Sequence, residues 1–360
     1  MKVTVYLSTY NQEQFVAQAL DSILMQKTDF DFEIIAADDC STDGTQAVIM
    51  DYVNRHPGKI IPFFTDPNVG GCKKLTDVID AGLFRGEYLA WLEGDDYWLG
   101  EDRLQTLVDF LESHPEYSRV SHQRRIVDEN GSLIGMDVPE EILNKPFTIE
   151  DFLAGWDYSD FASVFRNYFL EAGNRYHALL RSSRNVCDFQ DMFITQDFGP
   201  VYVMDRCFAV YRYRSVAGAS NYNSITTSRT RCIDHIRICR AVEDFYDGRY
   251  DLTPSIERYQ QRLLHDALSN RSGELFEESR DYIPSATLTR LAAREMYLSL
   301  RGRRMEECRF LLAQLRDSER KGFLRAFLGC TAQRLAGKLR GSRPDSTRRG
   351  YLVRKQEAHR

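Results

Sequence analysis

The first 115 residues alternate between two patterns of apolar positions. Short apolar runs rich in β-branched residues have the length of strands, and between them apolar residues recur at the spacing of amphipathic helices. The predicted strands are residues 3–7, 32–37, 59–64 and 88–92, and the predicted helices are 13–26, 45–55, 74–83 and 102–114. Strands that alternate with helices form a mostly parallel sheet with helices on both faces. The pattern therefore predicts an α/β protein with a Rossmann-like sheet.

The pattern changes along the rest of the chain. Residues 118–150 are predicted to form strands joined by the turn DENGS, followed by two helices and a late strand at 148–153, 188–198 and 201–211. Beyond residue 226 the apolar period is helical, over 229–247, 254–270, 285–300 and 303–317. We therefore predict an α/β domain over 1–225, a small C-terminal helical domain over 226–318, and a basic amphipathic or disordered tail over 319–360.

Composition and charge narrow the class of protein. The 360 residues are 43% hydrophobic and 28% charged with a net charge of −6, which is ordinary for a globular protein and unlike a nucleic-acid binder. No apolar run approaches the ~20 residues of a spanning helix, and the N-terminus has no signal-peptide pattern. The eight cysteines include no CxxC pair, which argues against a zinc site or a disulfide framework. These features predict a cytoplasmic protein.

The charge is unevenly distributed, because twelve Lys and Arg but only two acids fall between Arg320 and Arg360. Within 319–340, six large apolar residues lie near one helical face: Phe323, Leu324, Phe327, Leu328, Leu335 and Leu339. One interpretation is a helix that packs on the preceding helices. The other is a peripheral contact of residues 320–360 with anionic lipid on the inner face of the membrane.

Polar clusters follow three of the predicted strands. STYN follows the first strand, DDCSTD the second and EGDD the fourth. Because ligands of open parallel sheets bind beyond the carboxyl ends of the strands, these clusters predict one composite site.

Two of the loops contain candidate nucleotide-binding residues. In DDCSTDGT, residues 41–44 suit a turn and helix cap, whereas Asp38 and Asp39 have no evident capping role. An aspartate there could accept a hydrogen bond from a pyrimidine N3–H or hold a ribose. In NVGGCKK, two glycines and then Lys73 and Lys74 stand at a helix start, which suits a phosphate, although a plain loop has the same composition.

The stretch AWLEGDDYW places Glu93, Asp95 and Asp96 within four positions. A solvated turn would account for the charges but not for the four large apolar residues that flank them. Mg²⁺ and Mn²⁺ prefer carboxylate oxygens and can join them to a diphosphate. A divalent cation is therefore the predicted cofactor.

Several ordered motifs together resemble the family 2 nucleotide-sugar glycosyltransferases of the GT-A fold, over about residues 1–215. They are VTVYLSTYNQEQFVAQALDSIL, FEIIAADDCSTDGT, NVGG, GEYLAWLEGDDYW and DFQDMF…VYR. The resemblance implies that Glu93-Gly94-Asp95 is the DXD-type motif, with Asp95 as the principal metal ligand. It also implies that Asp39 recognises the base of the nucleotide. Residues assigned by the same likeness to the nucleotide pocket are Thr9, Asn11 and Glu13.

The resemblance also implies a catalytic base. Inverting transfer needs a carboxylate that takes the proton of the acceptor hydroxyl. In the family this base belongs to an acidic pair that opens a helix about two dozen residues before a Tyr-Arg pair. Counting back from Tyr211-Arg212 gives Asp188, with Asp191 as the rival one helical turn later. Asp191 is expected to orient an acceptor hydroxyl or to face solvent.

The chain departs from the family pattern at two places. Cys187 precedes Asp188 where the family often has Glu or Gly, and Tyr213-Arg214 follow where relatives often have a His. Arg212 and Arg214 are the candidate diphosphate contacts.

The resemblance implies an inverting transferase that moves a sugar from a nucleotide-diphosphate donor, taken as a UDP-sugar, to a hydroxyl of a glycan or lipid-linked acceptor in surface polysaccharide synthesis. One alternative is a sugar-1-phosphate nucleotidyltransferase, but its glycine-rich basic loop is replaced here by STYNQEQF. The other alternative is a non-catalytic relative that binds a nucleotide sugar.

Overall fold

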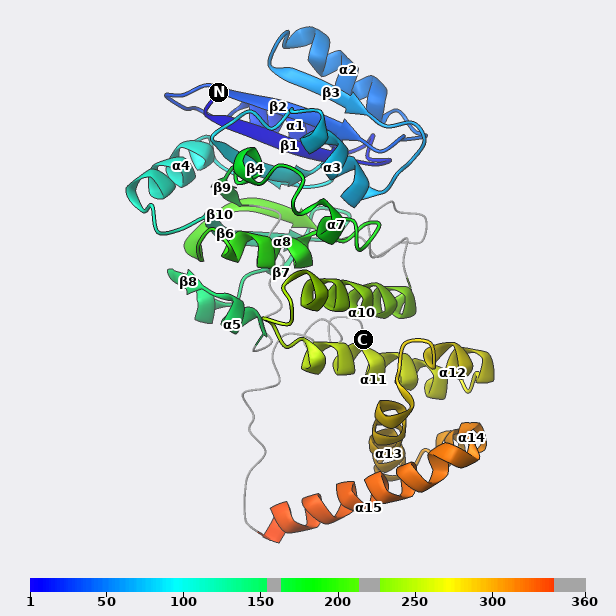
Figure 1. Ribbon diagram of the computed structural model, residues 1–360. Helices are drawn as coiled ribbons and strands as arrows, with labels where there is room; N and C mark the ends of the chain where they lie inside the picture. The colour runs from blue at the N-terminus through cyan, green and yellow to red at the C-terminus, as the bar shows by residue number, and fades with distance from the viewer. Residues whose placement is uncertain (154–162, 214–226, 340–360) are drawn as a thin grey trace. The chain divides into compact units, whose positions relative to one another are not determined.

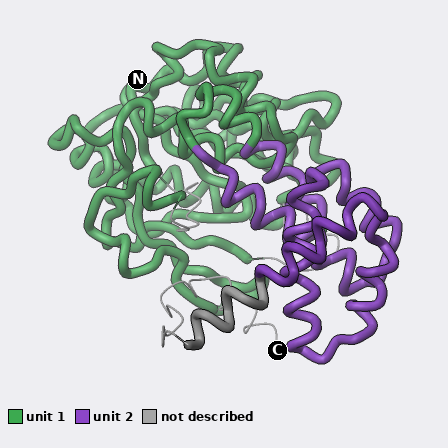
Figure 2. The backbone as a smooth tube through the Cα atoms, turned by 60° about the horizontal axis from the view of Figure 1, so that its bottom comes forward, with its two compact units in different colours: residues 1–227, 240–250 green, residues 228–239, 251–360 purple. Residues whose placement is uncertain are grey.

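The computed structural model describes residues 1–153, 163–213 and 227–339, with the backbone alone over 330–339. The chain forms two compact units, distinguished by colour in Figure 2: residues 1–227 with 240–250, and residues 228–239 with 251–360. The division therefore falls inside one helix, α10 (Ser228–Phe245). The predicted domain boundary near residue 225 lies outside the described residues and stays a prediction.

The first unit is built on a sheet of ten strands among the described residues, in the order β3-β2-β1-β4-β9-β6-β10-β5, with β7 and β8 attached at the side (Figure 1). Two groups of strands are parallel: β1 (Val3–Thr9), β2 (Phe32–Asp38), β3 (Ile60–Phe64) and β4 (Tyr88–Glu93), and then β6 (Arg119–Val127) with β10 (Val201–Arg212). The antiparallel strands are β5 (Tyr97–Trp98), β7 (Leu133–Met136), β8 (Lys145–Phe147) and β9 (Val164–Arg166). The prediction of an α/β fold with a central sheet is confirmed, and the sheet is mixed, with parallel pairing among β1 to β4 and between β6 and β10.

Helices cover both faces of this sheet. Because side chains alternate along a strand, Val3, Val5 and Leu7 point to one face, and they pack with residues of α1 (Val16–Leu24), α2 (Thr45–Arg55) and α4 (Arg103–Ser113). Tyr6 and Ser8 point to the other face. Helix α3 (Gly71–Asp80) lies there, since its Lys74 side chain reaches Ser8. Helix α3 contacts α7 (His177–Leu180), which in turn contacts α8 (Asp188–Gln196).

The elements that the sequence did not predict are short. They comprise β5, β9, the 3₁₀ turn at Glu140–Ile142, α6 (Phe169–Ala172), α7 and α12 (Gly273–Ser279). Elements of one or two turns, or of two or three strand residues, are too short to show a hydrophobic period. Helix α5 (Ile149–Leu153), by contrast, lies where it was predicted.

The second unit is helical. Besides the first part of α10 and α12, it contains α11 (Thr253–Ser269), α13 (Ser285–Arg301), α14 (Met305–Gln314) and α15 (Asp317–Leu339). Helix α15 crosses the predicted boundary at residue 319, because Glu319 forms an ion pair with Arg280 and Phe323 is buried in the helical core. The part of the predicted tail beyond residue 339 lies outside the described residues. Over the described ranges of both units, no helix has the length and apolar character needed to span a membrane.

Candidate active site

The three polar clusters that follow β1, β2 and β4 lie at one edge of the sheet. Thr9 at the end of β1 is in register with Asp38 at the end of β2, and Ser8 is in register with Glu93 at the end of β4. Since all three strands run in the same direction, their loops meet beyond their carboxyl ends, where such sheets bind ligands. The predicted convergence of the three motifs is confirmed.

Hydrogen bonds join the loop after β1 to the loop after β2. The backbone N–H of Asn11 donates to Ser41 Oγ at 2.8 Å, and Asn11 Oδ1 accepts from the backbone N–H of Thr42 at 2.7 Å. Glu13 Oε2 accepts from the backbone N–H of Gly44 at 3.0 Å. Asn11 and Glu13 thus fix the backbone of the predicted nucleotide pocket, and their contact with a nucleotide stays a prediction.

Asp38 closes the turn at the end of β2. Its carboxylate accepts from Thr9 Oγ1 at 2.9 Å, the backbone N–H of Ser41 at 2.8 Å and Gln46 Nε2 at 2.7 Å. The interpretation that Asp38 has no local capping role was therefore wrong. Asp38 is fully buried, so its carboxylate stabilises the loop and does not meet solvent. Thr9 is buried with it.

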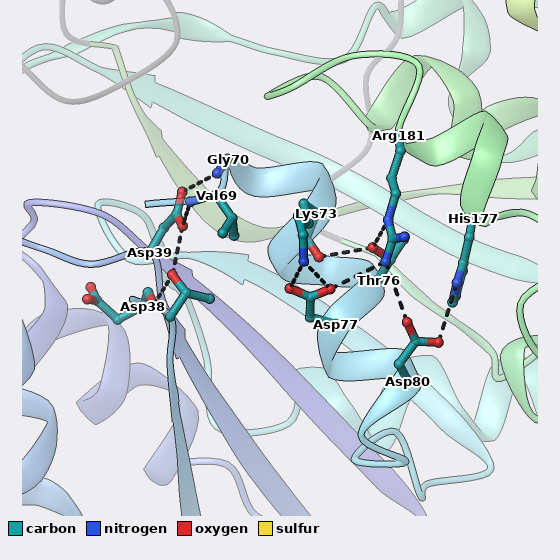
Figure 3. A network of polar contacts seen from close by, with 11 residues as sticks. Asp38, Asp39, Val69, Gly70, Lys73, Thr76, Asp77, Asp80, His177 and Arg181 are labelled. Carbon is teal, nitrogen blue, oxygen red and sulfur yellow. Dashed lines mark hydrogen bonds and ion pairs between the residues drawn. The ribbon is translucent and has the colours of Figure 1, made fainter. Parts of the chain in front are cut away.

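Asp39 holds the NVGG loop. Asp39 Oδ1 accepts from the backbone N–H of Val69 and Oδ2 from that of Gly70, both at 2.8 Å (Figure 3), while Thr65 Oγ1 donates at 2.9 Å. Gly70 has a φ of 89°, and a Cβ there would lie 2.5 Å from the Arg184 side chain, so both conformation and space require glycine. The role of Asp39 in base recognition remains a prediction.

Lys74 has a structural position that was not foreseen. Its ammonium donates to Ser8 Oγ at 3.1 Å, to the Thr9 carbonyl at 3.0 Å and to the Ala37 carbonyl at 3.1 Å. These bonds use all three N–H donors, and Lys74 is buried beneath the strand ends. Burial lowers the pKa of Lys74, against the opposing effect of nearby carboxylates. Lys74 therefore ties β1 to β2 and has no donor left for a phosphate.

Lys73 lies on the outer side of α3. Its ammonium forms an ion pair with Asp77 at 2.6 Å, and Asp77 and Thr76 also contact Arg181, which follows α7 (Figure 3). Lys73 is half exposed. Of the two lysines, only Lys73 remains a candidate for phosphate binding.

The EGDD turn is packed against the loop after β1. The backbone N–H of Gly94 donates to the Ser8 carbonyl at 2.8 Å, and Gln12 Nε2 donates to Asp95 Oδ1 at 3.0 Å. A Cβ on Gly94 would lie 2.5 Å from Gln12 Oε1, which explains a glycine between the two acids. Gln12 is a site residue that the sequence analysis missed, although its position in the STYNQ motif could have indicated it.

Arg212 supports the same turn from β10. Its backbone N–H donates to Asp96 Oδ1 at 2.8 Å, its Nε to the Asp95 carbonyl at 2.9 Å and its Nη2 to Gln18 at 2.9 Å. Its guanidinium also lies over the Phe15 ring, 4.7 Å from the centroid. Contact of Arg212 with a diphosphate stays a prediction, and Arg214 lies outside the described residues.

The surroundings of the acidic turn disfavour the ionised forms of Glu93 and Asp96. Burial raises the pKa of Glu93 to about 7, and the charges of Asp95 and Asp188 act in the same direction while Lys74 opposes them. Burial, followed by the charge of Asp95, raises the pKa of Asp96 well above its usual value. These shifts indicate that the described residues supply too little positive charge to keep all of these carboxyls ionised.

The carboxylates do not converge as a complete metal cage. Among residues 1–153, 163–213 and 227–339, no three His, Cys, Asp or Glu side chains are grouped to hold a metal ion. Asp96 is instead turned toward the backbone of Arg212. Mg²⁺ is commonly held by one or two carboxylates and substrate phosphates, so Asp95 fits such an ion only together with a diphosphate. The assignment of Glu93 and Asp96 as further ligands has no geometric support here.

Asp188 is the first residue of α8, and its Oδ1 accepts from the backbone N–H of Phe189 at 3.0 Å. The preceding loop packs on the start of α3, where the Cys72 N–H donates to the Arg184 carbonyl at 3.1 Å and the thiols of Cys72 and Cys187 are hydrogen-bonded. Cys187, where relatives often have Glu or Gly, thus fills a buried contact. Asp188 stands at a helix N-terminus, which favours its ionised form.

Asp191 is not at the site surface, contrary to expectation. It forms an ion pair with Arg119 of β6 and accepts a hydrogen bond from the Tyr168 hydroxyl, and it is buried. The residues of α8 from Gln190 to Thr195 are all buried, so one turn into the helix the side chains pack against the sheet. The expectation that Asp191 faces an acceptor or solvent was wrong, which leaves Asp188 without its rival.

The chain is similar in sequence to several known proteins. A protein of Mycobacterium tuberculosis with no assigned function is 41% identical over 124 residues, 34% of this chain and 35% of that protein. The poly(ribitol-phosphate) beta-N-acetylglucosaminyltransferase TarS of Staphylococcus aureus is 32% identical over 117 residues, 32% of this chain and 19% of that one. The matched segments thus span about a third or less of these relatives.

The fold has a counterpart among solved structures. Staphylococcus aureus TarS in complex with UDP-GlcNAc matches with a TM-score of 0.57 over 89% of this chain and 92% of that one, at 17% sequence identity. At this identity the likeness concerns the fold alone. The family model described as Glycosyl transferase family 2 matches residues 4–174, from β1 to α6, and includes the three strand-end loops. Over residues 4–174 the chain is therefore similar to glycosyl transferase family 2.

Proposed function

We propose that the chain is an inverting glycosyltransferase that moves a sugar from a UDP-sugar to a hydroxyl of a glycan or lipid-linked acceptor in surface polysaccharide synthesis. The observation that carries the proposal is that the acidic turn and the start of α8 affect the same buried carboxyl group. The charges of Asp95 and Asp188 both act to raise the pKa of Glu93. Sugar transfer needs a group that holds the donor diphosphate close to a group that takes the proton of the acceptor hydroxyl.

In this proposal Asp188 accepts the proton of the acceptor hydroxyl as that oxygen attacks the anomeric carbon. Asp95, oriented by Gln12, holds Mn²⁺ or Mg²⁺ together with the diphosphate. The ion supplies charge compensation for the departing nucleoside diphosphate. The loops fixed by Asp38, Asp39 and Asn11 form the floor of the nucleotide pocket.

The names of the relatives support the choice of donor. TarS is named as a beta-N-acetylglucosaminyltransferase, and its structure contains UDP-GlcNAc. UDP-GlcNAc is therefore the first donor to test. The absence of Gly, Lys and Arg from STYNQEQF disfavours a nucleotidyltransferase.

The experiment is a panel of UDP-sugars tested for UDP release and for a shift in melting temperature, with Mn²⁺ and with excess chelator. Selective binding to the folded state raises the apparent stability. We expect one UDP-sugar to give a metal-dependent shift and turnover that Asp95→Ala abolishes. Binding without turnover for any acceptor would favour the non-catalytic alternative. Full activity in chelator would contradict the role of the metal.

A further inference from the structure

Helix α15 has two apolar faces. Phe323 is buried in the core of the second unit, and its ring stacks on that of Phe327 at 6.0 Å between centroids. A Cβ on Gly322 would lie 3.4 Å from Thr289 of α13, so this side of α15 packs closely on α13. Leu324 and Leu328, which the core does not require, are 57% and 65% exposed.

The exposed leucines belong to one stripe of the helix. Residues four apart lie on the same face of a helix, so Leu324 and Leu328 are neighbours. Leu335 and Leu339 stand eleven residues after them, three helical turns further along α15. Lys321 and Arg325 are exposed beside the first pair. The exposed leucine face, meaning Leu324 and Leu328 of α15, thus has two exposed basic neighbours, Lys321 and Arg325.

The charge of this end of the chain is opposite to that of the rest. With twelve basic and two acidic residues, 320–360 carry a net charge of +10, and the other 319 residues carry −16. A basic segment is attracted to an anionic partner, whereas the acidic remainder of the chain is repelled by it. An anionic surface is the complementary partner.

We propose that the exposed leucine face of α15 docks the protein on an anionic lipid bilayer. Interfacial helices bury an apolar stripe at the boundary of headgroups and acyl chains while flanking Lys and Arg attract anionic lipid. A nucleic acid would account for the charge but not for the leucines, because single strands are bound through aromatic stacking and duplexes through polar contacts. Docking of this kind goes beyond the proposed sugar transfer and does not depend on it.

The test is flotation of the full-length chain with vesicles of phosphatidylcholine containing phosphatidylglycerol, and with vesicles of phosphatidylcholine alone. We expect binding to the anionic vesicles to be at least about tenfold tighter and to weaken with salt. Leu324→Ser with Leu328→Ser should lower binding about tenfold or more. Lys321→Gln with Arg325→Gln should lower it and reduce its salt dependence.

A matched control is Leu133→Ser with Ile134→Ser on β7, where both side chains are similarly exposed. This pair should float as the wild type does. Equal flotation of the Leu324/Leu328 variant and the wild type, with the same circular dichroism, would overturn the proposal. So would equal binding to the two vesicle types, or tighter binding to DNA than to anionic vesicles. Because flotation requires no turnover, its failure is separable from failure of the proposed activity.

Discussion

Asp191 and Arg119 form an ion pair in which each side chain is only 1% exposed. The pair connects α8 to β6, and the Tyr168 hydroxyl donates a hydrogen bond to the same Asp191 carboxylate. Two charges removed from water are tolerated only while they are paired. The helix that begins with Asp188 is therefore anchored by a charge pair three residues after its first residue.

Asp191→Asn should destabilise the protein by ~3–5 kcal/mol, because it leaves the Arg119 guanidinium buried without a counter-charge. Urea denaturation followed by circular dichroism measures the change. Asp188→Asn is the matched control on the same helix and should stay within ~1 kcal/mol of the wild type, since Asn can accept the same hydrogen bond from the Phe189 N–H. Wild-type stability of Asp191→Asn would show that the pair contributes no net stabilisation.

Gln12→Leu should weaken the binding of Mn²⁺ in the presence of UDP by ~10–100-fold, the usual effect of removing a hydrogen bond to a ligating side chain. The reason is that Gln12 Nε2 donates to Asp95 Oδ1 and orients it. Titration calorimetry measures the affinity, and Gln14→Leu, two residues on and exposed, is the control. Unchanged Mn²⁺ affinity in Gln12→Leu would remove Gln12 from the site.

Lys74→Met should lower the free energy of unfolding by ~3–5 kcal/mol, since it removes the positive partner of buried acidic groups. The exposed neighbour Lys73→Met should change it by less than ~1 kcal/mol, as expected for a surface ion pair. Chemical denaturation with and without UDP separates a stabilising role of Lys74 from a role in binding phosphate. If Lys74→Met kept its stability but lost UDP affinity, Lys74 would have the phosphate-binding role that the sequence indicated.

The strand-end clusters could be predicted from the sequence because their information is local. Each cluster follows an apolar run directly, and the alternation of strands and helices brings parallel strand ends to one edge. The acidic turn that contains Asp95 was predicted in this way, from a strand end. Asp188 was instead assigned by the family resemblance, through its spacing from Tyr211-Arg212.

The partners of buried polar groups could not be predicted, because they come from distant parts of the chain. Asp191 is buried by Tyr168 and Arg119, which lie 23 and 72 residues away in sequence. Lys74 meets Ser8 across 66 residues. A lysine that follows two glycines has the same local pattern whether it faces a phosphate or a pair of backbone carbonyls. Only the packing of α3 on β1 decides between them.

The assignment of the base can now be tested on a single residue. Asp188 begins α8, where the helix dipole favours the carboxylate, and its charge reaches Glu93 of the acidic turn. Asp188→Asn should fold normally and still bind UDP-sugar with Mn²⁺, because Asn can keep the hydrogen bond from the Phe189 N–H and Asp95 is not altered. Its turnover should fall ~100-fold or more, the scale of a lost general base.

A catalytic role of Asp188 and a purely structural role predict changes in different measured quantities. Loss of the hydrogen bond at the start of α8 alone would cost ~1 kcal/mol of stability and leave turnover intact once the protein is folded. Loss of the base lowers kcat with little change in the affinity for donor, which the melting-temperature shift with UDP-sugar reports independently. Asp188→Asn with wild-type kcat would mean that another group takes the proton, and the charge of Asp188 near Glu93 would then serve only to place the acidic turn.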